Sequence, residues 1–311
     1  MIDRARRWIA RDAGGTAHWA LVDAEVAPPR EGEITVLVRA AGMNPADLKH
    51  VLAGPASAFP VPLGYEISGD VVAIGERTAI GSGDVEIGDR VVAFRVQGGY
   101  ATRLTISAAK AFRKPVPLSH AEAANLLLAG TTAAELLDRA RAVAGETVLL
   151  HGASGAVGAM VLQLAMLRGV TVIGTASPAS GDRVRRFGGL PVAYGPGLAA
   201  RVRAIGAPVA ALDAVGTDEA VDVSLELVAD RARIVTIAAP ARASRDGFVA
   251  LAGRQPSSAA FRDGIRGELV RLADEGLLRV PLARTYRLDE AIAATRVLAE
   301  GHPGGKLALI P

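Results

Sequence analysis

The stretch "VLLHGASGAVGAMVL" at residues 148–162 decides how this chain folds, because a glycine-rich turn here joins an apolar strand pattern to an apolar helix pattern. The run "ETVLLHG" is typical of a buried strand, and "AVGAMVLQLAML" is typical of a helix. A turn of this kind between a strand and a helix is the arrangement of the dinucleotide fingerprint, in which a pyrophosphate lies at the helix N-terminus. The alternative is a tight turn that binds nothing.

The three fingerprint positions are occupied by Ala153, Gly155 and Gly158, so that a small alanine replaces the first glycine. Gly155 would let the backbone approach the pyrophosphate, and Gly158 would let the helix pack against the strand. The predicted cofactor cradle consists of Ala153, Ser154, Gly155, Ala156, Val157 and Gly158.

The end of the next strand indicates which dinucleotide is bound. An NAD site places Asp or Glu about 20 residues after the fingerprint to bind the ribose 2′-hydroxyl. This chain has Thr175 and Ser177 there, followed by Arg183, Arg185 and Arg186. Hydroxyl groups and a guanidinium suit a 2′-phosphate, so we predict NADPH, with Arg183 as a ligand. Which arginine meets the phosphate stays open, and the alternative is that they cover a solvent-facing helix.

The pattern of predicted secondary structure changes twice along the chain. Residues 1–118 contain short β-rich runs, predicted to form a mostly antiparallel barrel or sandwich. Residues 119–253 alternate strands with helices, the pattern of a doubly wound parallel sheet. Residues 254–311 have no phosphate motif and could complete either domain. Single helices are predicted over 119–140 and 257–276.

Composition excludes several classes of protein. The 311 residues are 50% hydrophobic and include no cysteine, and the five histidines show no metal-ligand spacing, so we predict no metal site. The net charge is only +3 with scattered arginines, which speaks against nucleic acid as a partner. The charged N-terminus and the lack of an apolar run of about 18 residues predict a cytoplasmic protein without a membrane partner.

Several motifs, in order along nearly the whole chain, resemble the medium-chain dehydrogenase/reductase superfamily, and within it the zinc-free quinone oxidoreductase branch. They are "AAGMNPADLKHVLAG", "VPLGYEISGDVVAIG", "IGDRVVAF", "GGYA", "LAGTTA", "HGASGAVG" and "GGKLALI". The resemblance implies an α/β fold in which a Rossmann domain, residues 119–253, is inserted into a GroES-like, β-rich catalytic domain. Residues 1–118 and 254–311 would form that catalytic domain.

Zinc-dependent alcohol dehydrogenases of this superfamily place metal ligands at the positions occupied here by Asn44, Tyr65 and Leu128. Of the surrounding pattern only Glu66 remains, and one carboxylate cannot hold a catalytic zinc. The resemblance therefore implies transfer of a hydride to an electron-poor acceptor, such as a quinone or a conjugated enone, without zinc.

The resemblance also implies roles for individual residues. Asn44 would face the nicotinamide and the substrate, Tyr65 would line the substrate cleft between the domains, and Thr132 would touch the nicotinamide or its ribose. Lys306 would reach the cofactor. "NPAD" is also a helix start, so Asn44 could cap a helix instead or as well, and Tyr65 could be a core aromatic. Gly216, after a later strand, would give the cofactor room.

The sequence thus predicts an NADPH-dependent reductase of quinones or conjugated enones, with a proton supplied by water or Tyr65. His151 is predicted to fix the turn rather than to act as an acid or base, and Asp213 could be only a turn former. The alternatives are an enoyl or alkenal reductase, or a dinucleotide-binding regulatory protein without turnover. A homodimer formed at the Rossmann sheet edge is implied by the resemblance alone.

Overall fold

The computed structural model describes residues 3–253, 255–301 and 304–311. The chain divides into two compact units. The first unit contains Met1–Leu128 and Gly267–Pro311, and the second contains Ala129–Arg266. Arg254, where the predicted C-terminal part begins, lies outside the described residues.

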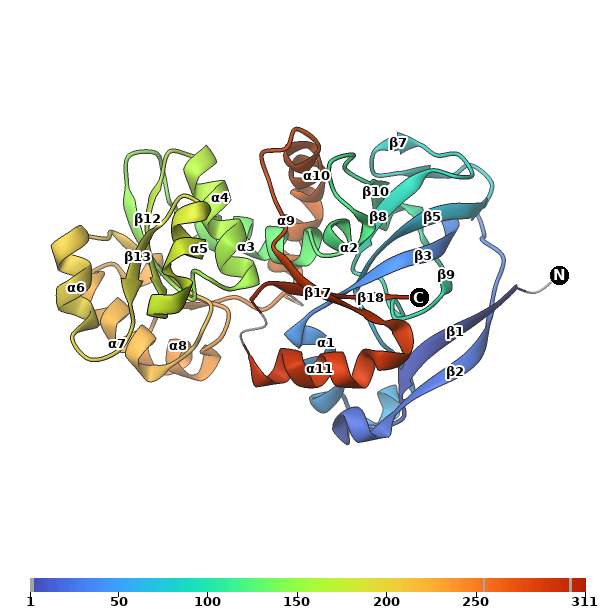
Figure 1. The fold of residues 1–311 in the computed structure, drawn as a ribbon, viewed down its shortest axis with the longest axis horizontal. Helices are drawn as coiled ribbons and strands as arrows, with labels where there is room; N and C mark the ends of the chain where they lie inside the picture. Colours follow the sequence, from blue (N-terminus) through green and yellow to red (C-terminus); the bar gives the residue numbers. More distant parts are fainter. Residues whose placement is uncertain (1–2, 254, 302–303) are drawn as a thin grey trace. The chain divides into compact units, whose positions relative to one another are not determined.

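A seven-stranded sheet forms the centre of the first unit (Figure 1). Its strands, in spatial order, are β10 (Ala111–Arg113), β8 (Arg90–Phe94), β5 (Glu66–Ile74), β3 (Glu33–Met43), β18 (Lys306–Ile310) and β17 (Leu282–Arg287), and β9 (Arg103–Ser107) also pairs with β3. The last strand, β18, runs antiparallel to β3, with Leu307 opposite Met43. The C-terminal tail therefore completes the sheet that the N-terminal part begins.

Alternating apolar side chains of this sheet form the core of the first unit. Ile34, Val36, Ile67, Val91 and Leu309 belong to one buried cluster, because residues two apart on a strand face the same side. The sequence did not predict the hairpin of β1 (Asp3–Ala10) and β2 (Trp19–Val26), in which β1 also pairs with β4 (Val61–Pro62). The remaining elements are β6 (Ala79–Ile80), β7 (Gly83–Asp84), α1 (Pro45–Leu52), α2 (His120–Ala123), α10 (Arg266–Asp274) and α11 (Ala291–Glu300).

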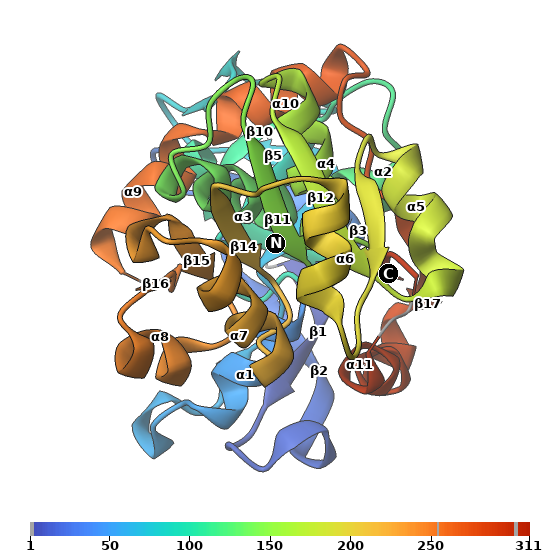
Figure 2. The ribbon, with the colours of Figure 1, turned by 90° about the vertical axis from the view of Figure 1, so that its left-hand side faces the viewer.

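The second unit contains a six-stranded sheet in which every pairing is parallel. Figure 2 shows its central strands side by side with helices around them. Its order is β13 (Leu190–Ala193), β12 (Thr171–Ala176), β11 (Thr147–His151), β14 (Ala210–Asp213), β15 (Ile234–Thr236) and β16 (Val249–Ala250). The chain starts in the middle and winds outward in both directions, which confirms the predicted doubly wound sheet.

Helices connect these strands because parallel neighbours need a crossover. They are α4 (Ala156–Leu167), α5 (Gly181–Arg186), α6 (Leu198–Ile205), α7 (Asp218–Leu227) and α8 (Pro240–Asp246), whereas α3 (Leu127–Arg139) precedes β11 and α9 (Pro256–Gly264) follows β16. Helix α4 is apolar over most of its length, and eight of its residues are buried. It packs against β12.

Two predicted helices are each interrupted, so those predictions were wrong. The helix expected over residues 119–140 divides into α2 and α3. At the break the chain packs closely on β3, since a β-carbon on Gly42 would lie 2.0 Å from the Ala124 carbonyl oxygen. The helix expected over 257–276 divides at Gly264 into α9 and α10. Glycine is a poor helix former and favours such a break.

The first unit extends to Leu128 rather than to residue 118, and the second to Arg266 rather than to residue 253. Asn125 holds the first boundary, since its Nδ2 donates to the carbonyl oxygen of Leu307 on β18 at 3.1 Å. Glu135 on α3 holds the second, since it accepts hydrogen bonds from Ser258 (2.8 Å) and Arg262 (2.6 Å) of α9. Buried polar contacts thus set both boundaries.

We expect Gly158→Ala to destabilise the second unit. A β-carbon at this position would lie 2.3 Å from the Gly152 carbonyl oxygen, and the backbone would have to move. Overpacking of this kind costs about 1–3 kcal/mol, which a fall in the thermal midpoint would report. Gly155→Ala is the matched control, because its nearest neighbour would lie at 3.3 Å and its φ is −77°. Equal midpoints for the two variants would contradict the prediction.

Candidate active site

The glycine-rich turn of the second unit has the geometry of an anion cradle. Strand β11 ends at His151, Gly152 has a φ of +79°, and α4 begins at Ala156 with Gly155 as its N-cap. The Ala153 N–H donates to the Thr175 carbonyl oxygen at 3.0 Å, which ties the turn to β12. The exposed Gly155 leaves the N-terminus of α4 open to an anion.

Arg183 is the arginine that reaches the turn. Its guanidinium donates to the Ser154 carbonyl oxygen at 3.3 Å, whereas Arg185 pairs with Asp182 at 2.7 Å. Arg186 lies over the ring of Phe187, 5.9 Å from its centroid. The structure therefore singles out Arg183 as the cation beside the cradle.

The two hydroxyl residues predicted at the end of β12 differ in accessibility. Thr175 is buried, and its Oγ1 accepts a hydrogen bond from the Gly152 N–H at 3.2 Å. Ser177 is half-buried, and its hydroxyl donates to Ser180 at 3.1 Å. Thr175 thus stabilises the turn through the Gly152 N–H, and Ser177 lies nearer to solvent.

His151 belongs to the framework of the turn. It is buried, with Nε2 3.1 Å from the Ser224 hydroxyl. Since that hydroxyl donates to the Ala220 carbonyl oxygen, Nε2 carries the proton. Burial lowers the pKa of His151 to about 4, so the ring is neutral at neutral pH. An uncharged, fully packed ring is suited to fixing the turn.

Asp213 shapes the turn after β14. Its Oδ1 accepts hydrogen bonds from the N–H groups of Val215 and Gly216, both at 2.9 Å, and its Oδ2 accepts one from Thr236 at 2.6 Å. Gly216 has a φ of +81°, and a β-carbon there would lie 2.7 Å from the Ala238 carbonyl oxygen. This glycine is required by its conformation and by the close approach of the neighbouring loop.

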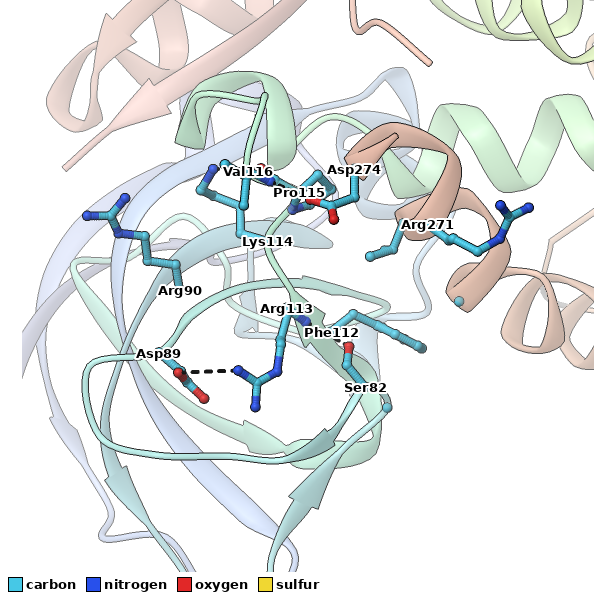
Figure 3. A pocket seen from close by; sticks show the side chains of 13 residues that line it. Ser82, Asp89, Arg90, Phe112, Arg113, Lys114, Pro115, Val116, Arg271 and Asp274 are labelled. Carbon is cyan, nitrogen blue, oxygen red and sulfur yellow. Dashed lines mark hydrogen bonds and ion pairs between the residues drawn. The ribbon is translucent and has the colours of Figure 1, made fainter. Parts of the chain in front are cut away.

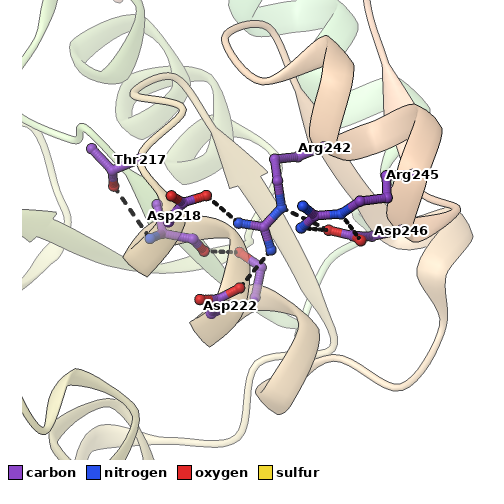
Figure 4. Close-up of polar contacts among 8 residues, drawn as sticks. Thr217, Asp218, Asp222, Arg242, Arg245 and Asp246 are labelled. Carbon is purple, nitrogen blue, oxygen red and sulfur yellow. Dashed lines mark hydrogen bonds and ion pairs between the residues drawn. The ribbon is translucent and has the colours of Figure 1, made fainter.

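An ionic cluster joins the helices that follow β14 and β15 (Figure 4). Arg242 of α8 contacts three carboxylates, those of Asp218 and Asp222 on α7 and that of Asp246 on its own helix. These hydrogen bonds raise the pKa of Arg242, and the guanidinium groups of Arg245 and Arg242 lower the pKa of Asp246 to about 2. The cluster holds the two helices beside the turn that Asp213 shapes.

In the first unit, Asn44 lies at the junction of β3 and α1. It is the N-cap residue of α1, but its side chain does not cap the helix. Instead its Nδ2 donates to Glu66 Oε1 at 3.0 Å, and its Oδ1 accepts from the Lys306 ammonium. The helix start is secured by Asp47, which accepts a hydrogen bond from the Asn44 backbone N–H at 2.7 Å.

The Glu66 carboxylate accepts hydrogen bonds from Asn44 and Leu128, two of the positions that the sequence linked to metal ligands in zinc-dependent relatives. The N–H of Leu128 donates to its Oε2 at 2.9 Å, and Asn44 donates to its Oε1. The Lys306 ammonium lies 3.4 Å from Oε1. Tyr65, next to Glu66 in sequence, is half-buried and has its ring edge-on to His50 with centroids 5.0 Å apart. Asn44, Glu66, Leu128 and Lys306 thus converge.

The second unit contains the other predicted site residues. Thr132 is buried on α3, and Ala153 is buried in the turn. The cofactor roles of all these residues remain predictions.

The sequence prediction missed Asp47 and Tyr100, which extend this polar network. The Tyr100 hydroxyl donates to Asp47 Oδ2 at 2.8 Å, and both residues are buried. Asp47 Oδ1 has no hydrogen-bond partner among the described residues. Burial raises the pKa of Asp47 to about 7, and it raises the pKa of Tyr100 well above the ordinary value of a tyrosine. The signal in the sequence was "NPAD", in which an acidic residue stands three positions after the N-cap, where its side chain can accept from the N-cap backbone N–H.

We expect Asp47→Asn to remove a pH dependence of stability. The pKa of Asp47 is about 7 in the folded protein against an ordinary value of 3.8. Its contribution to stability is therefore complete below pH 3.8 and is lost as the pH rises toward 7. The wild type should lose roughly 3 kcal/mol of unfolding free energy relative to the variant between about pH 5 and pH 8. Denaturant titrations at both pH values measure this loss. The exposed Asp23→Asn control should keep the wild-type dependence, and parallel curves for wild type and D47N would contradict the prediction.

A cavity of about 500 Å³ opens in the first unit between β10 and α10 (Figure 3). Its lining is rich in cations, and three of them already have partners. Arg113 donates to the Asp84 carbonyl oxygen at 2.7 Å and Arg271 to Glu275 at 2.6 Å. Lys114 donates to the Pro115 carbonyl oxygen at 2.8 Å. We assign no role in the site to this cavity.

Comparison with known proteins places the chain. The family described as "Alcohol dehydrogenase GroES-like domain" matches residues 30–116, and the family described as "Zinc-binding dehydrogenase" matches residues 202–309. The chain belongs to the medium-chain dehydrogenase/reductase superfamily.

Within this superfamily the chain is similar to quinone oxidoreductases. It is 29% identical to the quinone oxidoreductase of Pseudomonas aeruginosa, over 93% of this chain and 94% of that protein. The crystal structure of Escherichia coli quinone oxidoreductase complexed with NADPH superposes with a TM-score of 0.83 at 25% identity, covering 98% of this chain and 100% of that one. The second-unit cradle thus has a structural relative that holds NADPH.

A third relative is much longer than this chain. Polyketide synthase GfsB of Streptomyces halstedii is 31% identical over 98% of this chain, but the match covers only 6% of the synthase. The chain also spans less than half of the length of the next four curated relatives it matches.

The described residues contain no cluster of three or more His, Cys, Asp or Glu side chains placed to hold a metal ion. Within the same ranges, no helix is both long and apolar enough to cross a membrane.

Proposed function

We propose that this member of the medium-chain superfamily is an NADPH-dependent reductase that reduces a quinone or a conjugated enone without zinc. The observation that carries the proposal is the pairing of an open, glycine-rich helix N-terminus with Arg183. These groups suit a pyrophosphate and a 2′-phosphate, respectively.

The residues of the second unit fit the cofactor. Ser154, Gly155, Ala156, Val157 and Gly158 would hold the pyrophosphate, because the backbone there is exposed or half-buried, with Gly158 packed beneath it. Ser177 and Arg183 would bind the 2′-phosphate, and no carboxylate follows β12 to repel it before Asp182, which is already paired. Thr132 and Gly216 would border the nicotinamide end. NADPH supplies a hydride when it is bound.

The chain itself supplies orientation and a proton. Asn44 and Tyr65 would orient the acceptor by hydrogen bonding, and a proton would come from the Tyr65 hydroxyl or from water. Without cysteine or histidine at the positions of Asn44, Tyr65 and Leu128, polarisation of the acceptor by a protein-bound zinc has no ligand set. An already electron-poor acceptor needs no such polarisation. A cytoplasmic location and a homodimer also remain proposals.

A second candidate is the reduction of a conjugated carbon–carbon double bond in an acyl chain. The likeness of 98% of this chain to a segment of a polyketide synthase favours it, because such synthases assemble acyl chains. Product analysis separates the two candidates, since one gives a quinol and the other a saturated carbonyl compound.

A panel of quinones and conjugated enones tests the proposal. With at least one member of the panel we expect NADPH to be consumed, and the decrease in reduced-nicotinamide absorbance measures this consumption. Tyr65→Phe should lower kcat by about tenfold or more if its hydroxyl supplies the proton, and it should leave kcat unchanged if water does. NADPH binding without turnover of any acceptor would support a regulatory role and contradict the proposed activity.

The choice of cofactor is tested by Arg183→Ala. Loss of the guanidinium should weaken NADPH binding by about tenfold or more and leave NADH binding nearly unchanged, because only NADPH carries the 2′-phosphate. Dissociation constants from nicotinamide fluorescence measure both effects. Arg186→Ala is the matched control, since Arg186 lies over Phe187 on the same helix. Tighter binding of NADH than of NADPH by the wild type would rule out the assignment.

A further inference from the structure

Lys306 is buried within the first unit, and its ammonium group has three hydrogen-bond acceptors. Only 4% of its surface is exposed, and its ammonium group donates to the Met43 carbonyl oxygen at 3.2 Å and to Asn44 Oδ1. Glu66 Oε1, at 3.4 Å, is the third acceptor. An ammonium group has three protons, so these acceptors use its full hydrogen-bonding capacity.

The pairing of β18 with β3 fixes this position. Leu307 lies opposite Met43, and the Lys306 N–H donates to the Pro281 carbonyl oxygen at 2.6 Å. The backbone of Lys306 is therefore held on both sides, and its side chain has little freedom to turn toward another partner.

Lys306 and Glu66 together determine which way the Asn44 amide points. The amide oxygen faces the ammonium group, and the amide nitrogen faces the carboxylate at 3.0 Å. A flipped amide would place NH₂ against the cation and the oxygen against the anion, which is unfavourable on both sides. Asn44 is 1% exposed, so water could not replace the lost hydrogen bonds.

We propose that Lys306 is a positioning residue that acts through Asn44, and not a ligand of the cofactor. With Glu66 as its counter-ion, it locks the orientation of the Asn44 amide and, through Glu66, the start of β5 next to Tyr65. The two residues proposed to orient the acceptor thus depend on one buried ion pair. This inference rests on the proposed function only in that Asn44 and Tyr65 act on the bound acceptor.

The sequence offers a direct spectroscopic test, because Asn44 and Asn125 are its only asparagines. In protein labelled with ¹⁵N-asparagine, only these two side-chain amides are observed. We expect Lys306→Met to shift the Asn44 amide signals and to speed their exchange with solvent by about tenfold or more. Asn125, which donates to the carbonyl oxygens of Ala121 and Leu307, should keep its protection and shows that the fold is intact.

A double variant keeps the test interpretable if Lys306→Met alone unfolds the protein by leaving Glu66 without a cation. Glu66→Gln combined with Lys306→Met removes both buried charges at nearly constant volume. We expect this variant to fold and to show the same loss of Asn44 protection. Retained Asn44 protection in both variants would overturn the proposal.

Binding and turnover separate the two roles of Lys306. A positioning residue predicts that the dissociation constant of NADPH, measured without acceptor, changes by less than about twofold in K306M, whereas kcat falls by about tenfold or more. Lys110→Met, at a half-buried position of the same unit, is the matched control for loss of a lysine. An increase of about tenfold in the NADPH dissociation constant with unchanged kcat would show a cofactor ligand and overturn the inference.

The same measurements distinguish failure of the proposed function from failure of the role given to Lys306. If the wild type binds NADPH but reduces no acceptor, the activity is wrong, yet the amide signals of Asn44 and the NADPH dissociation constant still decide the role of Lys306. If the wild type turns over and K306M changes neither kcat nor the Asn44 amide, the proposed function stands and the role given to Lys306 is wrong.

Discussion

The antiparallel pairing of β18 with β3 is the contact on which the first unit depends. It joins the last residues of the chain to the middle of the N-terminal sheet, and it carries Lys306 to Asn44 and Glu66. A buried carboxylate is costly without a cation, and a buried ammonium group is equally costly without acceptors. The strand pairing meets both requirements at once, so the tail is an integral part of this unit.

The two units hold their candidate site residues by different physical means. The second unit presents backbone groups: a helix N-terminus, a turn with Gly152 at positive φ and a close approach at Gly158. Its polar side chains, such as His151 and Asp213, are buried and serve to hold those turns in place. The first unit instead presents side chains held by other side chains, and a substitution there acts through electrostatics more than through backbone shape.

The polar network around Glu66 includes Asn44 and Leu128, two of the positions that the sequence resemblance links to metal ligands in zinc-dependent dehydrogenases. An amide and a backbone N–H, from Asn44 and Leu128, meet the carboxylate, and an ammonium group balances its charge. An ammonium group donates hydrogen bonds but accepts no electron pair, so it provides charge without Lewis acidity. The proposed reduction of an electron-poor acceptor is compatible with such a centre, because beyond the hydride of the cofactor it requires only orientation and a proton source.

Local sequence patterns determined the parallel sheet, the turn around Gly158 and the absence of a carboxylate directly after β12, because these depend on periodicity and on residues close together in the chain. Composition and motif order also placed Asn44, Tyr65 and Lys306 in one superfamily framework. Only the tertiary structure placed Arg183 against the Ser154 carbonyl oxygen, divided the helices at Ala124 and Gly264, and brought Asp47 against Tyr100. Those outcomes depend on contacts between segments far apart in the chain, and on burial, which local patterns do not encode. The partners of Lys306 were decided in the same way, by a strand pairing that spans nearly the whole sequence.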